Sequence, residues 1–271
     1  MPRPTAPISE YFSLESPLAT EYRRLFHNLR SAGSKSELKA ILITSSVTGE
    51  GKSTISSLLS ITSARKGHRT VLIDCDIRRP HIHSLFQLER VGGLVEVIGD
   101  GISYKDVLKK SSLDNLDILT AGKPTPHPSE LFNTGAIDAL IRELKFYYDY
   151  VIIDSPPVIP VSDPMLLSHS VDGVILVVKA GETAREVAVR AVDIMTTNRA
   201  NVLGVVLNNA MNSLPYYYDY QHYHYDYTPT GDDGSGKKES RRRSHRHSGS
   251  DAAPTRPGEP LVTPDKKRLA K

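Results

Sequence analysis

The sequence has a single cysteine, no tryptophan and no long uninterrupted apolar segment. Because Cys75 stands alone, a disulfide within the chain and a metal site built from several cysteines are both excluded. No segment reaches the roughly 20 consecutive apolar residues that a membrane-spanning helix requires. Residues 1–10 also lack the apolar core of a secretory signal. We therefore expect a cytoplasmic protein whose contacts with a membrane are at most peripheral.

A large excess of charge of one sign is missing as well. Lysine and arginine together number 34 and aspartate and glutamate 31, which gives a formal net charge of +3. This balance does not favour a nucleic acid partner, so we expect none. The chain does have 39% hydrophobic residues over 271 positions, which suits one α/β domain with flexible extensions.

Short apolar segments alternate with helix-like segments along most of the chain. Apolar residues at helical spacing follow Pro17 and stop at Gly33, which predicts a first helix. Unbroken apolar strands between helices indicate an α/β fold with a mostly parallel sheet and helices on both faces. The predicted strands are residues 40–44, 70–74, 116–119, 150–153, 173–178 and 202–207.

Composition divides the chain into four segments. Residues 1–15 contain three prolines and no periodic pattern, and we expect a flexible N-terminal arm. Residues 16–213 carry the apolar pattern of the folded domain, and residues 214–227 contain seven tyrosines. Residues 228–271 are rich in glycine, serine, proline and basic residues, which predicts a disordered basic tail.

A glycine-rich segment joins the strand at 40–44 to the helix that follows. Residues 46–53 have the spacing of a P-loop, except that Ser46 stands where the first glycine is usual. Lys52 would then reach the β- and γ-phosphates of a nucleotide, and the Ser53 hydroxyl would bind Mg²⁺; the alternative is a chance glycine-rich turn. The predicted nucleotide-binding residues here are Thr48, Gly49, Glu50, Gly51, Lys52, Ser53 and Thr54.

Three aspartates leave the ends of two other strands. Asp154 follows residues 151–153, where an acid of P-loop enzymes holds Mg²⁺ through water, unless it is only a cap or loop residue. Asp74 and Asp76 can both face the phosphates, and a kinase needs such a carboxylate near the incoming hydroxyl. The alternative for this pair is a solvated surface turn. Cys75, between them, fits a packed residue better than a nucleophile.

Together, these motifs resemble the bacterial tyrosine kinases, cytoplasmic partners of membrane proteins that control capsule and exopolysaccharide chain length and export. Residues 48–54 match the family's Walker A motif, residues 71–78 are similar to its D-x-D-x-R motif, and residues 151–157 match its D-x-x-P Walker B motif. The resemblance covers about residues 16–209 and includes the segments 121–131 and 161–163.

The resemblance implies ATP and Mg²⁺ as cofactors and assigns a role to each site residue. Asn208 stands where relatives place an asparagine that contacts adenine. Arg78 would contact either the phosphates or the acidic tail, and Asp74 is favoured over Asp76 as the base. The implied catalytic residues are Lys52, Asp74, Asp76 and Arg78, and the implied metal ligands are Ser53, Asp76 and Asp154.

The tyrosine cluster is the family's other hallmark, and the resemblance implies autophosphorylation there, in trans, by a neighbouring subunit. The same aromatic residues would alternatively stack on a partner or dock on the domain. The implied phosphoacceptors are Tyr216, Tyr217, Tyr218, Tyr220, Tyr223, Tyr225 and Tyr227.

The resemblance also implies partners. The family's N-terminal helix joins subunits through an E-x-x-R-x-x-R motif, which is incomplete here in either possible alignment. One alignment puts Thr20 at the glutamate and Phe26 at the last arginine. The other gives Glu21 and Arg24 but His27 at the last arginine. We still expect a homo-oligomer that is recruited to the inner face of the cell membrane by the cytoplasmic segment of a polysaccharide co-polymerase. The basic residues between 237 and 246 are either simply solvated or contact anionic lipid.

Two other functions remain open from the sequence. The first is a non-kinase P-loop ATPase switch of the partition or division-site type, in which the tyrosines only dock cargo. The second is a nucleotide-gated scaffold for polysaccharide export that has lost its chemistry. Phosphotyrosine on the purified protein separates a kinase from both, whereas ATP hydrolysis does not.

Overall fold

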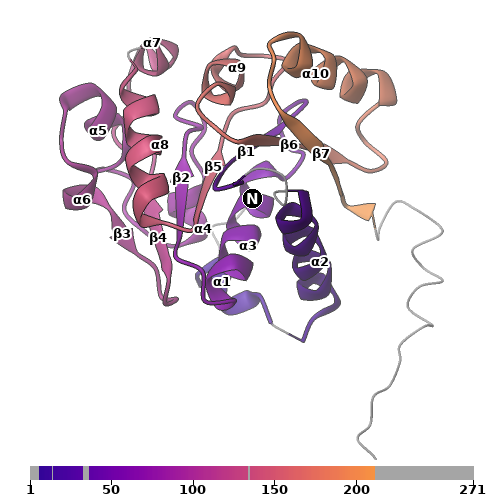
Figure 1. Ribbon diagram of the computed structural model, residues 1–271, viewed down its shortest axis with the longest axis horizontal. Coiled ribbons are helices and arrows are strands. Elements are labelled where there is room, and N and C mark those ends of the chain that lie inside the picture. The colour runs from indigo at the N-terminus through magenta and orange to yellow at the C-terminus, as the bar shows by residue number, and fades with distance from the viewer. Residues whose placement is uncertain (1–5, 14, 33–36, 134, 211–271) are drawn as a thin grey trace, which may run out of the picture. The chain divides into compact units, whose positions relative to one another are not determined.

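The computed structural model describes residues 6–13, 15–32, 37–133 and 135–210, so the tyrosine cluster and the basic tail lie outside the described residues. The described part contains one sheet of seven strands in the order β3-β4-β2-β5-β1-β6-β7 (Figure 1). Neighbouring strands are parallel, except that β3 runs antiparallel to β4. The predicted α/β class with a mostly parallel sheet is confirmed.

Each of the six apolar segments predicted as a strand is one. The remaining strand, β3, consists of two lysines, which carry no apolar signal in the sequence. The strands are β1 (Ala40–Ser45), β2 (Thr70–Asp74), β3 (Lys109–Lys110), β4 (Leu116–Leu119), β5 (Tyr150–Asp154), β6 (Gly173–Lys179) and β7 (Val202–Asn208).

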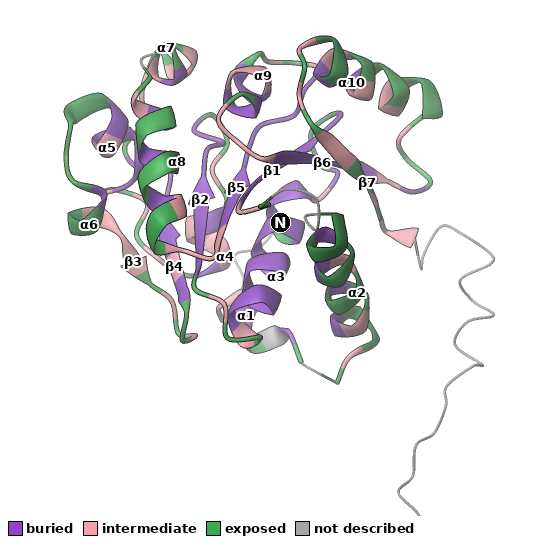
Figure 2. Ribbon diagram, viewed as in Figure 1, coloured by how far each residue is buried: buried purple, intermediate pink, exposed green. Residues whose placement is uncertain are grey.

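Helices cover both faces of the sheet, because successive side chains of each buried strand point to opposite sides. In β1, for example, Leu42 belongs to one hydrophobic core and Ile43 to the other. Figure 2 shows the central strands buried throughout. One face packs against α1 (Ile8–Tyr11), α2 (Pro17–Ala32), α3 (Lys52–Arg65) and α4 (Ile82–Leu85). The other packs against α5 (Leu94–Asp100), α6 (Tyr104–Val107), α7 (Pro128–Phe132), α8 (Ala136–Tyr147), α9 (Asp163–Ser168) and α10 (Arg185–Thr197).

Helix α3, which follows the P-loop, is buried on nearly all sides although it is rich in serine. Its hydroxyls donate to carbonyls one turn earlier, as Ser60 Oγ does to the Ser56 carbonyl at 2.7 Å. Thr62 Oγ1 bonds the Leu58 carbonyl in the same way, also at 2.7 Å. These bonds satisfy the buried polar groups, so the helix can lie between the sheet and α2.

Part of the N-terminal segment predicted as a flexible arm packs on the domain. Phe12 is buried and meets the Tyr22 ring edge to face, with centroids 5.6 Å apart. Arg65 Nη1 donates to the Phe12 carbonyl at 2.6 Å. The prolines of this segment hid one short helical turn and an aromatic anchor from the sequence pattern.

Helix α2 packs through most of the apolar residues expected from its spacing, although Leu18 is exposed. Tyr22, Phe26 and Leu29 are buried against α3 and the sheet. Glu21 and Arg24, the residues of the incomplete oligomerisation motif, pair with each other at 2.6 Å on the exposed surface of the helix. An exposed pair of this kind contributes little to stability.

Asp172 fastens the amino edge of the sheet. Its Oδ2 accepts from the backbone N–H groups of Lys39 at 2.9 Å and Ala40 at 2.8 Å, where β1 begins. Its Oδ1 accepts from Lys145 Nζ of α8 at 2.5 Å. Burial would raise the pKa of Asp172, but the hydrogen bonds from Lys145 and the two backbone groups outweigh it and lower the pKa.

We predict that Asp172→Asn lowers the free energy of unfolding at pH 7 by about 1–3 kcal/mol, because charge-assisted hydrogen bonds are lost. A lowered pKa means that the carboxylate stabilises the fold fully above its ordinary pKa of 3.8, and that this stabilisation is lost as the pH falls through the lowered value. Urea unfolding at several pH values should therefore show a gap between the two proteins that closes in acid. Asp193→Asn, on the exposed surface of α10, is the control. A gap that stays constant with pH would contradict this account.

Candidate active site

The P-loop connects β1 to α3 at the carboxyl edge of the sheet. Gly49 and Gly51 have φ angles of 87° and 95°, in the left-handed region that favours glycine. A Cβ on Gly51 would also lie only 2.2 Å from Nδ2 of Asn208, so a side chain there would displace Asn208 as well as strain the backbone. The backbone of the predicted P-loop thus needs glycine at these two positions. Thr48, Gly49 and Thr54 are exposed at its rim.

Two neighbouring loops hold the P-loop in shape. Glu50 is buried, and its Oε2 accepts from the Val47 N–H at 2.8 Å while its Oε1 bonds the Thr183 hydroxyl. Asn208 Nδ2, at the end of β7, donates to the Glu50 carbonyl at 2.9 Å. Glu50 and Asn208, both predicted to bind the nucleotide, thus use their side chains to hold the P-loop. Thr183, which follows β6, was missed because nothing in the sequence marks a contact over 133 positions.

Lys52 is the centre of a buried cluster of charges. Its Nζ lies 2.6 Å from Asp76 Oδ2, 3.9 Å from Asp154 Oδ2 and 3.3 Å from the Ser53 hydroxyl. Burial would lower the pKa of Lys52, but Asp154 and Asp76 outweigh it and raise the pKa, so the ammonium stays charged. Four residues predicted from three separate segments are thus brought together.

Asp74 and Asp154 lie directly opposite each other on β2 and β5, and both are fully buried. Burial and the charge of Asp154 raise the pKa of Asp74 well above its ordinary value. Burial also raises the pKa of Asp154, although Lys52 opposes this. Asp74 is held on both sides, since Oδ2 accepts from the Ile82 N–H at 3.1 Å and Oδ1 from the Asp76 N–H at 3.2 Å.

The cluster fits a nucleotide with Mg²⁺. Asp154 Oδ1 accepts from Ser56 Oγ at 3.2 Å, whereas Asp154 Oδ2 and the Ser46 hydroxyl have no hydrogen-bond partner among the described residues although both are buried. No group of three or more histidine, cysteine or acidic side chains in the described segments is placed to hold a metal alone. Mg²⁺ does not need one, because it takes one or two carboxylates and completes its shell with phosphates and water.

Arg78 does not join the lysine cluster. Its Nε donates to Asp163 Oδ2 at 3.0 Å and its Nη2 to the Ser129 hydroxyl at 2.7 Å. It therefore turns toward α7 and α9, on the face of the sheet opposite α3. Ser129 and Asp163 lie in segments that resemble the family, but no role could be predicted for them.

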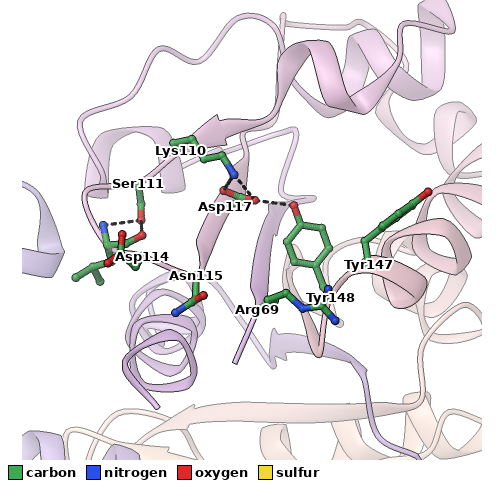
Figure 3. Close-up of a pocket in the computed structure, with 9 residues that line it drawn as sticks. Arg69, Lys110, Ser111, Asp114, Asn115, Asp117, Tyr147 and Tyr148 are labelled. Carbon is green, nitrogen blue, oxygen red and sulfur yellow. Dashed lines mark hydrogen bonds and ion pairs between the residues drawn. The ribbon is translucent and has the colours of Figure 1, made fainter. Parts of the chain in front are cut away.

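The opposite edge of the sheet carries a separate pocket of about 540 Å³ (Figure 3). Figure 3 shows Tyr148 and Lys110 directed at the same carboxylate, that of Asp117, with contacts of 2.7 Å and 2.8 Å. None of the predicted site residues lines this pocket. The P-loop edge is therefore the candidate active site.

Three further predictions concern Cys75, membrane-spanning helices and the tail tyrosines. Cys75 is fully buried, and burial raises the pKa of its thiol, as expected for a packed residue. Among the helices of the described residues, none is both long and apolar enough to cross a bilayer. The seven candidate phosphoacceptor tyrosines lie outside the described residues.

Comparison with known proteins agrees with this geometry. The family model described as ParA, NUBPL iron-transfer P-loop NTPase, matches residues 37–225. The tyrosine-protein kinase YwqD of Bacillus subtilis is 35% identical over 208 residues, which cover 77% of this chain and 86% of that protein. The tyrosine-protein kinase CpsD of Streptococcus agalactiae is 32% identical over 184 residues, 68% of this chain and 79% of that protein.

A solved structure gives the same result. The kinase domain of the Escherichia coli tyrosine kinase ETK superposes with a TM-score of 0.72 at 26% identity, covering 77% of this chain and 82% of that one. Sequence, fold and the three motifs at one sheet edge agree, and the chain belongs to the bacterial tyrosine kinase family of P-loop NTPases.

Proposed function

We propose that this protein is an ATP-dependent tyrosine autokinase that phosphorylates its own C-terminal tyrosines and thereby regulates the polymerisation and export of a capsule or exopolysaccharide. Its family relatives are tyrosine-protein kinases. The observation that carries the proposal is the position of Asp76, which lies two residues past the end of β2 and has a carboxylate oxygen 2.6 Å from Nζ of the P-loop lysine. A switch ATPase has only to position water, whereas a kinase needs such a group beside an incoming hydroxyl.

The P-loop binds the triphosphate of ATP. Lys52 and the backbone N–H groups at the start of α3 contact the β- and γ-phosphates. Ser53 and Asp154 would hold Mg²⁺, which neutralises phosphate charge and orients the γ-phosphate when it is bound. We do not propose Asp76 as a metal ligand as well, because its carboxylate is assigned to the acceptor. Asn208 contacts the base from the end of β7, while its Nδ2 keeps the P-loop in shape.

Asp76 acts on the acceptor. Phosphates give Lys52 a second anionic partner, which leaves Asp76 Oδ2 able to accept a proton. The phenolic oxygen of a tail tyrosine forms the new bond to the γ-phosphorus, the bond from that phosphorus to the ADP oxygen breaks, and Asp76 takes the phenolic proton. Asp74 is better suited to fixing the Asp76 backbone than to being the base, because both of its oxygens accept backbone N–H groups, whereas in Asp76 only Oδ1 does, from Arg79 at 3.0 Å.

Phosphorylation then changes the tail. Each phosphotyrosine adds nearly two negative charges at neutral pH. Several of them repel one another and the acidic sheet edge, so a fully phosphorylated tail leaves the site and loosens a homo-oligomer that phosphorylates in trans. The cytoplasmic segment of a membrane co-polymerase recruits the protein to the inner membrane face and activates it.

Iron transfer, the role named in the matching family description, does not suit this chain. Iron and iron–sulfur ligation relies on accessible thiolates. The only cysteine, Cys75, is fully buried, and its thiol pKa is raised. We therefore do not propose this function.

The autokinase is tested by mass spectrometry of residues 214–227 after the purified full chain is incubated with Mg-ATP, with and without cytoplasmic segments of candidate membrane partners. Lys52→Met should lower tail phosphorylation about a hundredfold or more, because charge stabilisation at the phosphates is lost. Lys66→Met, at the exposed far end of the same helix, is the matched control and should keep the activity. Full phosphorylation of the Lys52→Met tail, or none in the parent despite bound ATP, would refute the proposal.

The roles of the two β2 aspartates are separable. Asp76→Asn should lower phosphate transfer about a hundredfold or more while ATP still binds, because the proton acceptor is removed. Asp74→Asn should lower phosphate transfer less, because the asparagine oxygen can still accept the Asp76 N–H and the proton acceptor is kept. Thermal unfolding, nucleotide binding and transfer are measured on both variants. An active Asp76→Asn protein beside an inactive but stable Asp74→Asn protein would make Asp74 the base.

A further inference from the structure

The side chain of Arg78 is fixed by a closed ring of three hydrogen bonds. Arg78 Nε donates to Asp163 Oδ2 at 3.0 Å, and Arg78 Nη2 donates to the Ser129 hydroxyl at 2.7 Å. Ser129 Oγ in turn donates to Asp163 Oδ1 at 2.6 Å. The three residues come from the segment after β2, from α7 and from the start of α9, so the ring forms only in the folded domain.

The ring leaves one edge of the guanidinium open. The Asp163 side chain is 1% exposed and has both oxygens engaged, whereas the Arg78 side chain is 39% exposed. Its Nη1 makes no hydrogen bond to any described residue. A buried carboxylate thus holds a cation at the surface and directs its unused donors outward, where a planar guanidinium suits a carboxylate or phosphate.

The strand order shows on which side of the site Arg78 lies. Along the carboxyl edge, β7 ends at Asn208, β1 leads into the P-loop, β5 ends at Asp154 and β2 leads to Asp76 and Arg78. A nucleotide with its base near Asn208 has its γ-phosphate near Asp76. Arg78 lies beyond that end and turns to α7 and α9, which contact each other at the upper edge in Figure 1. This is the side from which an acceptor must approach.

The tail offers a carboxylate next to its acceptor tyrosines. Asp219 stands between Tyr218 and Tyr220, and Asp226 between Tyr225 and Tyr227. We propose that Arg78 is the specificity-determining residue that binds a carboxylate adjacent to the acceptor tyrosine, and that Ser129 and Asp163 are positioning residues that aim it. This inference rests on the proposed autokinase function and names the acceptor chemistry that its site selects: tyrosine beside an acid.

The test is a trans-phosphorylation assay with full chains. The enzyme carries phenylalanine at its seven tail tyrosines, so label reaches only the acceptor, which is the Lys52→Met chain. KM for the acceptor, KM for ATP and kcat are measured for the enzyme with and without Ser129→Ala or Arg78→Gln. Each enzyme is paired with an acceptor that keeps its aspartates or carries Asp219→Asn with Asp226→Asn.

With the parent enzyme, the asparagine acceptor should show an acceptor KM about tenfold higher, the size of effect expected from one charge-assisted pair. With the unchanged acceptor, Ser129→Ala and Arg78→Gln in the enzyme should each raise the acceptor KM by about the same factor. With these variant enzymes, the asparagine acceptor should raise the acceptor KM by less than about twofold more. KM for ATP should stay unchanged in the Ser129→Ala enzyme. Ser129→Thr, which keeps the hydroxyl, should restore the acceptor KM.

Ser170→Ala is the matched control, since it removes another serine-to-aspartate hydrogen bond, to Asp138, at the opposite edge of the sheet. If the ring is purely structural, the asparagine changes should raise the acceptor KM by the same factor with every enzyme, or the ring variants should raise KM for ATP and for the acceptor alike. Either result would overturn this inference and leave the autokinase function standing. If the parent enzyme binds ATP but labels no acceptor, the autokinase function fails and this inference with it.

Discussion

One buried ammonium group at the carboxyl edge of the sheet faces three buried carboxylates, and the site depends on this excess of negative charge. Lys52 Nζ lies 2.6 Å from Asp76 and 3.9 Å from Asp154, while Asp74 sits opposite Asp154 in the sheet register. Desolvated carboxylates so close together raise one another's pKa, and a single lysine offsets only part of the cost. Surplus negative charge suits Mg²⁺, which brings positive charge to the acids, while the triphosphate gives Lys52 its phosphate partners.

The rest of the fold holds this unfavourable cluster in place. Apolar cores on both faces of the sheet fix β2 and β5, and Asp172 ties β1, β6 and α8 together at the far edge. At the site itself, Glu50 and Asn208 keep the P-loop in one conformation. These contacts hold the P-loop and the strands that carry the site in fixed positions. Phosphate transfer needs this, since catalytic groups must be held within fractions of an ångström.

Local signals allowed most of the architecture to be predicted from the sequence. Six strands are mostly apolar, and the P-loop is defined by glycines over a few positions, so each of these could be recognised without knowing its neighbours. The contacts of Ser129, Asp163 and Thr183 join segments 34 to 133 positions apart, and no local pattern encodes them. The proposed choice of Asp76 over Asp74 as the base was equally inaccessible, because it depends on Asp74 accepting backbone N–H groups at both oxygens and Asp76 at one. Strand β3, made of two lysines, was hidden for lack of any apolar residue.

The central claim is that this edge delivers the γ-phosphate to a tyrosine hydroxyl and not to water. The most direct measurement is a single-turnover reaction of the full chain with ATP labelled in its γ-phosphate, in which the label is followed as phosphotyrosine and as inorganic phosphate. This account predicts that most of the label enters phosphotyrosine before inorganic phosphate accumulates. Release of nearly all the label as inorganic phosphate, with the tail tyrosines unlabelled, would contradict it and favour a P-loop ATPase switch.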